Sequence, residues 1–208
     1  MTTWHPIDEA MRRQALSLGS STLHEAAGKI GALPPRILGL SPTLPVCGSA
    51  LPVLVPPGDN IWIHRAIYEA QPAEVLVVST HGAFEFGYFG EVMARAAKEK
   101  NIAGLVIDGC VRDALAIIDT GFPVFSTGRC VRGTRKRGEG GAMGSPVCIG
   151  DITIRRGDIV VGDWDGVIVL PRKSFPTILS DGAQRVAHEQ HVFKRLAAGE
   201  STLAILNL

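Results

Sequence analysis

Two patterns of apolar residues alternate along the chain. Continuous apolar runs, EVLVVS at 74–79, GLVID at 104–108 and FPVFS at 122–126, are typical of strands in a sheet that is covered on both faces. In the stretches that follow the first two runs, near 91–100 and 111–121, apolar residues recur every three or four positions, as on one face of a helix. Strands that alternate with helices in this way predict a parallel or mixed sheet with helical crossovers.

Helix start and stop signals divide the first 30 residues into two predicted helices. The first spans residues 6 to 18, with Pro6 at its start and Gly19 past its end. The second is capped by one of three hydroxyl residues at 20 to 22. Glu25 occupies the capping-box position after Thr22, and Gly28 ends the helix.

Turn residues organise the rest of the chain. Residues 31 to 60 predict loops with one or two strands within 46–55, and Asp59 or Asn60 predicts the cap of a helix that runs to Glu69. The runs ITI, IVVGD and VIVL between 152 and 170 are separated by Gly-Asp and Asp-Gly turns and predict a β-meander. Apolar residues then recur on one face of a predicted long helix, about 174 to 198, which should pack on the sheet or on a neighbour.

These elements place the chain in the α/β class. Its 208 residues, 46% of them hydrophobic, suffice for a sizeable core, so we expect one compact domain over residues 1–208 with a mixed sheet and a long C-terminal helix. The net charge of +1 comes from 21 basic and 20 acidic side chains and predicts neither a nucleic-acid partner nor a membrane partner. No membrane-length apolar run or signal-peptide pattern is present, which favours a cytoplasmic protein. The four cysteines lack metal or disulfide spacing, and we interpret them as small buried thiols.

The stretch from 87 to 113, GYFGEVMARAAKEKNIAGLVIDGCVRD, carries the candidate chemistry. Gly87 and Gly90 precede a helix that opens at Glu91, and the unpaired amides of a helix N-terminus attract anions such as carboxylates. Arg112 and Asp113 directly follow the strand at 104–108. Ligands of α/β sheets bind beyond the carboxyl ends of strands, so the helix start and the Arg-Asp pair can converge on one crevice.

These residue types suit the binding of a small 2-oxo acid. The planar fork of Arg112 matches a carboxylate or an enolate oxygen. Asp113 and Glu91 offer the hard oxygen ligands that Mg²⁺ and Mn²⁺ prefer, and such an ion would stabilise the enolate of pyruvate. The alternative is that Arg112 and Asp113 form structural ion pairs or cap the next helix.

The same stretch resembles the class II pyruvate aldolases of the 4-hydroxy-4-methyl-2-oxoglutarate aldolase type, whose superfamily includes the regulator of ribonuclease E activity. The resemblance rests on GYFGE, on GLVIDGCVRD and on the spacing, because 112 − 91 − 1 gives the family's twenty residues between an acid and Arg-Asp. That acid is usually Asp, whereas this chain has Glu91. STLHEAAGKIGALPPRI is also similar to the family, and it suggests that His24 and Glu25 face the substrate. A solvated or core-edge position for His24 is the alternative.

The resemblance implies specific roles. Arg112 would contact the substrate, Asp113 would bind the divalent metal, and Glu91 would hold water on that metal. Gly90 and the amides of Val92 and Met93 would receive the pyruvyl carboxylate. The implied reaction, in the degradation of aromatic compounds, cleaves 4-hydroxy-4-methyl-2-oxoglutarate or 4-carboxy-4-hydroxy-2-oxoadipate to pyruvate and a second oxo acid. Oxaloacetate decarboxylation is implied as a side activity through the same enolate.

The C-terminal helix extends the resemblance. RVAHEQHVFKRLAAGE is similar to the family's terminal helix, in which a glutamate reaches the site of an adjacent subunit, and Glu189 matches that position. The family fold implied is a compact α/β sandwich assembled as a homotrimer or hexamer with the site near a subunit interface. His188 and His191 do not form an HExxH motif, so we interpret them as solvated helix residues.

Other candidates have structural explanations. The basic residues of the loop at 129–137 lack interleaved aromatics, which favours a mobile loop at a subunit contact or over an acidic substrate. Asp163 and Asp165 favour turn formation over metal binding. The motif contains no lysine for a Schiff base, which favours a metal mechanism. The alternative function is that of a non-catalytic regulator that binds a ribonuclease or another protein partner.

Overall fold

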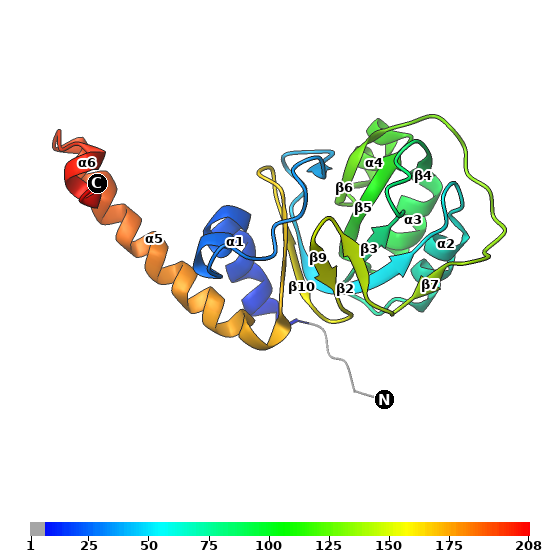
Figure 1. Cartoon of the computed structure of the whole chain (residues 1–208), viewed down its shortest axis with the longest axis horizontal. Helices are drawn as coiled ribbons and strands as arrows, with labels where there is room; N and C mark the ends of the chain where they lie inside the picture. Colours follow the sequence, from blue (N-terminus) through cyan, green and yellow to red (C-terminus); the bar gives the residue numbers. More distant parts are fainter. Residues whose placement is uncertain (1–6) are drawn as a thin grey trace.

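A mixed sheet forms the centre of the molecule (Figure 1). The computed structural model describes residues 7–208, and within them nine strands form this sheet, in the order β1-β6-β5-β3-β2-β10-β11 with β4 beside β5 and β7 beside β2. The pairs β2·β3, β3·β5, β5·β6 and β4·β5 are parallel, and the others are antiparallel. The strands are β1 (Leu38–Gly39), β2 (Val46–Leu54), β3 (Glu74–Ser79), β4 (Gly87–Phe89), β5 (Gly104–Val111), β6 (Val124–Arg129), β7 (Ala142–Met143), β10 (Ile159–Gly162) and β11 (Val167–Leu170).

Helices cover one face of the parallel strands. These helices are α2 (Ile61–Glu69), α3 (Glu91–Glu99) and α4 (Ala114–Thr120). Their buried residues form a continuous core with the side chains that β2, β3 and β5 direct to that face. The opposite face carries a second core under a small two-stranded sheet of β8 (Val147–Ile149) and β9 (Ile152–Ile154). Both faces are therefore buried, which explains the continuous apolar runs in the sequence.

Helices α1 (Glu9–Ala26) and α5 (Phe175–Ala197) pack against the β10 and β11 end of the sheet. A short 3₁₀ turn, Arg172–Ser174, leads into α5, and α6 (Thr202–Leu206) follows it. The predicted α/β class, mixed sheet and long C-terminal helix are confirmed. The predicted strand at 74–79 and the predicted helix from 60 to 69 also agree with β3 and α2.

The predicted β-meander is wrong at its first connection. Only β10 and β11 pair as a hairpin, whereas β9 pairs with β8 in a separate sheet and β10 pairs with β2. The turn residues correctly mark where the chain reverses, but they do not determine which strands become neighbours. The sequence also gave no sign of β4, which is three residues long.

The first two predicted helices form one element with a break. Gly19 has φ 79° and ψ 163°, which interrupts α1 at the predicted position, whereas Pro6 lies outside the described residues. The predicted capping box is wrong, because Asp163 of the β10·β11 turn caps the second half of α1. Its two carboxylate oxygens accept from the backbone N–H and the hydroxyl of Ser20, each at 2.6 Å.

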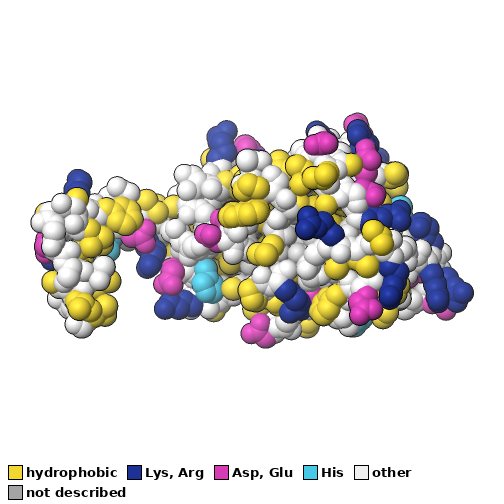
Figure 2. All heavy atoms as spheres, turned by 90° about the horizontal axis from the view of Figure 1, so that it is seen from above, with side chains coloured by type: hydrophobic (Ala, Val, Ile, Leu, Met, Phe, Trp, Pro, Cys, Tyr) yellow, Lys and Arg dark blue, Asp and Glu magenta, His cyan; other side chains and the backbone are white. Residues whose placement is uncertain are grey.

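The C-terminal half of α5 stands apart from the body of the molecule (Figures 1 and 2). The described residues of α5 that are buried all lie in its first half, at Phe175, Ile178, Leu179 and Gly182. Phe193 and Leu196 belong to the apolar face of the helix predicted at about 174 to 198, but both are exposed, as are Leu203 and Leu206 in α6. Within one chain, only the first half of the helix packs against the sheet as predicted.

No helix within residues 7–208 is long and apolar enough to cross a membrane. The cysteines form no disulfide, as predicted, but only Cys47 is fully buried, and burial raises its pKa to about 12. Cys110 and Cys130 are half-buried and Cys148 is exposed, so the prediction of four buried thiols is wrong for these three.

The Asp163 cap gives a stability prediction. Asp163→Ala leaves the buried Ser20 amide and hydroxyl without their acceptor, so the free energy of unfolding should fall by about 1 to 2 kcal/mol. Asp165→Ala is the matched control, because it removes only an exposed contact with Ser21 and should cost less than about 0.5 kcal/mol. Urea unfolding of the three proteins measures both values, and equal losses for the two variants would contradict the assignment.

Candidate active site

Two glycines bring the end of β4 unusually close to the end of β5. A Cβ atom on Gly87 would lie 2.4 Å from the Cys130 carbonyl oxygen, and one on Gly90 would lie 2.6 Å from Oδ2 of Asp113. Both distances are shorter than real Cβ contacts. A side chain at Gly87 would meet the backbone of Cys130, whereas a side chain at Gly90 would require the Asp113 carboxylate to turn away. The Arg112 amide donates to the Phe89 carbonyl at 2.9 Å and fixes the alignment of the two strands.

Asp113 lies at the junction of β5 and α4. Its backbone is left-handed, with φ 57° and ψ 35°, a conformation that Asp tolerates better than most residues and that is frequent at functional sites. Its Oδ2 atom lies 3.7 Å from Nε of Arg112 and accepts a long hydrogen bond, 3.3 Å, from the Glu91 amide. The expected convergence of the α3 start with the Arg-Asp pair is therefore present in the structure.

The first turn of α3 offers one free amide. The N–H groups of Met93 and Ala94 both donate to the Gly90 carbonyl, at 3.1 and 3.0 Å. The Val92 N–H has no acceptor among the described residues. Of the two amides predicted to receive a carboxylate, Val92 is available and Met93 is already used within the turn.

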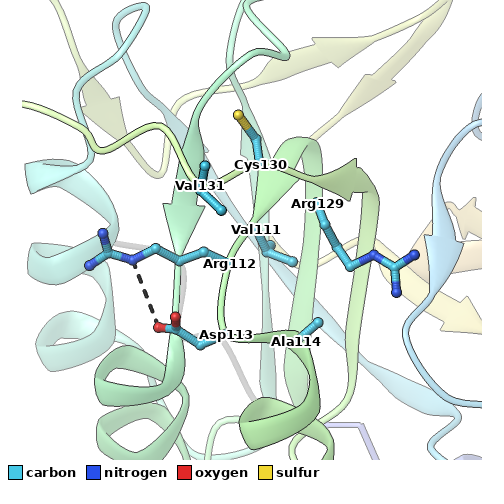
Figure 3. A pocket seen from close by; sticks show the side chains of 7 residues that line it. All are labelled: Val111, Arg112, Asp113, Ala114, Arg129, Cys130 and Val131. Carbon is cyan, nitrogen blue, oxygen red and sulfur yellow. Dashed lines mark ion pairs between the residues drawn. The ribbon is translucent and has the colours of Figure 1, made fainter.

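Arg112 and Asp113 separate two cavities. Figure 3 shows the larger one, of about 530 Å³, which Arg129, Cys130 and Val131 also line. The smaller cavity, of about 200 Å³, contains the predicted residues Gly90, Val92, Met93, Arg112 and Asp113, and its other lining residues are Asn60, His64, Gly87, Tyr88 and Lys136. This smaller cavity is the candidate substrate site, and we call it the Arg112 pocket.

Three polar residues of the Arg112 pocket were missed in the sequence. Asn60 precedes α2, His64 lies one turn further along that helix, and Lys136 comes from the basic loop. Asn60 was predicted only as a helix cap, a task that Asp59 performs instead by accepting from the Ile61 amide at 2.9 Å. No periodicity or spacing in the sequence relates Lys136 to Asp113.

Hydrogen bonds fasten the segment 135–138 of the basic loop to the start of α2. Arg135 exchanges backbone hydrogen bonds with Gly58 at 2.7 Å and Asn60 at 3.2 Å. The Asp59 carboxylate accepts from the backbone amides of Arg137 and Gly138. This part of the loop is anchored, which differs from the mobile loop expected, and the anchoring places Lys136 beside the pocket.

The charges of this region are set by its surroundings. Burial alone would raise the pKa of Asp59, but hydrogen bonds from three backbone amides and the charge of Lys136 outweigh it and lower that pKa. Burial, assisted by the charge of Lys136, lowers the pKa of His64. At neutral pH the Asp59 side chain is therefore ionised, whereas the His64 imidazole is uncharged.

The remaining predicted residues lie elsewhere. The Glu91 carboxylate turns along α3 to Arg95, with Oε1 2.7 Å from Nη2, and it does not line the Arg112 pocket. Glu189 lies on α5, on the far side of the molecule from α3 and α4 (Figure 1), 3.2 Å from Arg185, which also approaches Glu25 at 3.8 Å. His24 contacts the Ile30 carbonyl through Nδ1 at 3.0 Å.

The donors of the pocket fit a hard, hydrated cation. No cluster of three or more His, Cys, Asp or Glu side chains that could hold a metal occurs in the described residues. Mg²⁺ and Mn²⁺ need fewer protein ligands, because they retain several waters and take oxygen from the bound substrate. Asp113, partly exposed at the mouth of the pocket, is a suitable single carboxylate ligand for such an ion.

Comparison with known proteins identifies the class that this fold and site define. Residues 9–169 match the family model described as RraA-like: Aldolase/RraA, and the chain belongs to this family. Among its relatives, a protein of Halalkalibacterium halodurans named "Putative 4-hydroxy-4-methyl-2-oxoglutarate aldolase" is 31% identical over 192 residues, 92% of this chain and 90% of the relative.

Solved structures of similar proteins include an uncharacterized protein from Pseudomonas syringae pv. tomato. It is 26% identical with a TM-score of 0.84, over 97% of this chain and 94% of that one. Streptomyces coelicolor RraAS2, described as an unusual member of the RNase ES inhibitor RraA protein family, is 27% identical with a TM-score of 0.77, over 90% and 98% of the two chains. The family thus includes proteins named as enzymes and proteins named as inhibitors.

The anchoring of the basic loop can be tested by proteolysis. Asp59→Ala removes the acceptor of two loop amides, so trypsin should cleave faster after the basic residues at 135–137 than in the wild type. Asp151→Ala, which changes an exposed carboxylate, is the control and should leave the cleavage rate unchanged. Comparable cleavage in all three proteins would show that Asp59 does not hold the loop.

The lowered pKa of Asp59 also predicts a pH dependence. A carboxyl group whose pKa is lowered by folding contributes stability above its unfolded pKa and loses that stability as the pH falls through the folded value. The difference in the free energy of unfolding between the wild type and Asp59→Ala should be full at neutral pH and shrink below about pH 4. A difference that grew on acidification would contradict this.

Proposed function

We propose that this protein is a divalent-metal-dependent carbon-carbon lyase. Its substrates are 4-hydroxy-2-oxo acids such as 4-hydroxy-4-methyl-2-oxoglutarate or 4-carboxy-4-hydroxy-2-oxoadipate, which it cleaves to pyruvate and a second oxo acid. It also decarboxylates oxaloacetate. The observation that carries the proposal is the meeting of a guanidinium, a carboxylate and a free helix amide, from Arg112, Asp113 and Val92, in one small pocket.

In this proposal each group acts on one part of the substrate. The Val92 amide, at the positive end of α3, binds the pyruvyl carboxylate, and the Arg112 fork binds the 2-oxo oxygen. Asp113 would hold the Mg²⁺ or Mn²⁺ ion, which supplies Lewis acidity where negative charge develops. The charge of Arg112 and the α3 amide stabilise the same developing charge.

The cleavage step requires a base. A water molecule takes the proton of the C4 hydroxyl, oriented by Glu189 from another copy of the chain, or by Glu91 once its carboxylate turns from Arg95 toward the pocket. The bond between C3 and C4 then breaks, the second oxo acid leaves, and the electron pair becomes the pyruvate enolate. Protonation at C3 completes pyruvate. Decarboxylation of oxaloacetate reaches the same enolate by loss of CO₂.

Assembly from several copies would complete the site. Val92, Leu115 and Val131 lie at or next to the two cavities and are 79%, 78% and 93% exposed, which is typical of a surface that another molecule covers. The second half of α5, which carries Glu189, contacts the short α6 but leaves Phe193 and Leu196 exposed. A trimer or hexamer in which α5 of one copy covers the pocket of the next would bury both surfaces.

A pyruvate-release assay tests the function. The purified protein should release pyruvate from 4-hydroxy-4-methyl-2-oxoglutarate and from oxaloacetate when Mg²⁺ or Mn²⁺ is present, and should stop when the metal is chelated. The rate of pyruvate release has to exceed the rate measured with the metal ion and substrate in the absence of the protein. Its absence with both substrates and both metals would end the proposal.

The assignment of Asp113 predicts that removing its charge abolishes activity. Asp113→Asn is the sharper variant, because Asn tolerates the left-handed backbone at this position and keeps the shape of the side chain. It should fold with nearly unchanged stability but release no pyruvate at any metal concentration. Asp119→Asn, an acid on α4 that does not line the Arg112 pocket, is the control and should remain active. Full activity of Asp113→Asn would refute the metal role.

Lys136 lines the pocket, although the sequence motif contains no lysine. An imine between this lysine and the substrate therefore has to be tested directly. If the metal route operates, borohydride added with pyruvate should leave the activity intact. Irreversible inactivation that Lys136→Gln prevents would favour a Schiff base instead.

Two variants of Arg112 distinguish the effect of its positive charge from the effect of its planar geometry. Arg112→Lys keeps the positive charge but loses the planar fork, so it should behave almost like Arg112→Ala. One charged hydrogen bond to a developing oxyanion is worth about 3 to 4 kcal/mol, so the rate should fall by a factor on the order of a hundred to a thousand. Both cleavage and decarboxylation rates should fall, because they share the enolate. Impaired cleavage with unchanged decarboxylation would mean that Arg112 recognises the distal part of the larger substrate.

A non-catalytic regulator is the second candidate. The structural likeness to a protein of the RNase ES inhibitor RraA family supports this candidate, because one fold can serve an enzyme in one protein and a protein-binding function in another. The pyruvate assay separates the two candidates, since a regulator would release none.

A further inference from the structure

Three arginines lie beside the Arg112 pocket without lining it. Arg65 follows His64 on α2, and Arg135 and Arg137 flank the lysine of the basic loop that lines the pocket. All three residues are exposed, and none of them forms an ion pair within residues 7–208. We call these three residues the basic rim.

Packing holds the basic rim in place. The Arg65 guanidinium lies 4.6 Å from the centre of the Trp62 ring, and the ring nitrogen of Trp62 donates to the Gly138 carbonyl at 2.9 Å. The hydrogen bonds that anchor the segment 135–138 to the start of α2 hold the backbone of the other two arginines. The three residues therefore keep a fixed position relative to the pocket.

The positive charge of this surface is only partly offset. Within four residues of a rim arginine in the sequence, the exposed acids are Glu69 and Glu139, and neither of them pairs with the rim. The Asp59 carboxylate is occupied by backbone amides of the loop. Figure 2 shows that Lys and Arg side chains gather at the end of the molecule that α2 and the basic loop form. The whole chain carries a net charge of only +1, so this excess is local.

A charge of this kind acts on an anion without touching it. Residues next to the pocket lining place their charges roughly 10 Å from a bound ligand. In water at low salt, one cation at about 10 Å raises the local concentration of a monoanion about twofold and that of a dianion about fourfold. The effect extends over about 30 Å at 0.01 M salt but only about 8 Å at 0.15 M, so it weakens as salt is added.

We propose that the basic rim draws anionic substrates to the Arg112 pocket by long-range attraction and so favours substrates with more carboxylates. The proposal rests on the function proposed above and adds residues that determine specificity by charge alone. The attraction stabilises the bound substrate and the transition state equally. It therefore raises kcat/KM, which is measured from the free substrate, and leaves kcat unchanged.

Three substrates that share the pyruvyl half test the proposal. They are 4-hydroxy-2-oxovalerate, 4-hydroxy-4-methyl-2-oxoglutarate and 4-carboxy-4-hydroxy-2-oxoadipate, with one, two and three carboxylates. At about 10 mM ionic strength and one fixed metal concentration, the double variant Arg65→Gln/Arg137→Gln should lower kcat/KM roughly threefold, tenfold and twentyfold in that order. At about 150 mM every loss should shrink below about fourfold, and kcat should stay within about twofold throughout.

Two matched variants separate charge from structure. Arg65→Lys/Arg137→Lys keeps both charges but loses the planar forks, so it should retain the kcat/KM of the wild type for all three substrates. Arg13→Gln/Lys173→Gln removes two exposed cations from α1 and from the turn before α5, and it should also retain it. Urea unfolding of each variant checks that the fold is intact.

The proposal would be overturned by equal losses for the three substrates, by losses that persist at high salt, or by a Lys variant as impaired as the Gln variant. Equal losses in the Arg13→Gln/Lys173→Gln control would assign the effect to net charge and overturn it too. If the wild type releases no pyruvate from any of the substrates, the function proposed above fails and this proposal with it. If the wild type is active but kcat/KM does not follow substrate charge, only this proposal fails.

Discussion

The site depends on two missing Cβ atoms. A side chain at Gly87 would clash with the Cys130 carbonyl, and a side chain at Gly90 would clash with the Asp113 carboxylate, so the two glycines let β4 and the start of α3 lie close to the ends of β5 and β6. With any side chain at Gly90, the Asp113 carboxylate would have to move, and with it the acceptor of the Glu91 amide.

Elements that show either a continuous apolar run or a clear helical spacing of apolar residues were predictable from the sequence. β3 and the buried part of β5 follow from uninterrupted apolar runs, and α3 follows from its helical spacing and the glycine before it. The strand β4 was missed because its three residues, Gly87–Phe89, are too few to show an apolar period. The meander failed because turn residues specify a reversal of the chain, whereas pairing of β9 with β8 depends on distant contacts.

The residues of the site that lie within one sequence motif were predictable, whereas those brought in by contacts between distant segments were not. Arg112, Asp113 and Val92 lie within one motif, so their convergence followed from the order of strand and helix along the chain. Asn60 and His64 reach the pocket from the start of α2, and Lys136 reaches it through the fastening of the basic loop to Asp59, an interaction between residues almost eighty positions apart. The acids Glu25 and Glu189 both pair with Arg185 on α5, away from the pocket, so the sequence resemblance that placed them in the site finds no counterpart among the contacts of residues 7–208.

In the proposed reaction, Arg112, Asp113 and the α3 amide together stabilise a pyruvate enolate. Exchange of the pyruvate methyl protons with deuterated water, followed by NMR, reports that enolate without the need for a cleavable substrate. We expect the protein to accelerate this exchange when Mg²⁺ or Mn²⁺ is present and to lose the acceleration in Asp113→Asn and Arg112→Lys. A protein that binds pyruvate and the metal but leaves the exchange rate at its uncatalysed value would contradict the account.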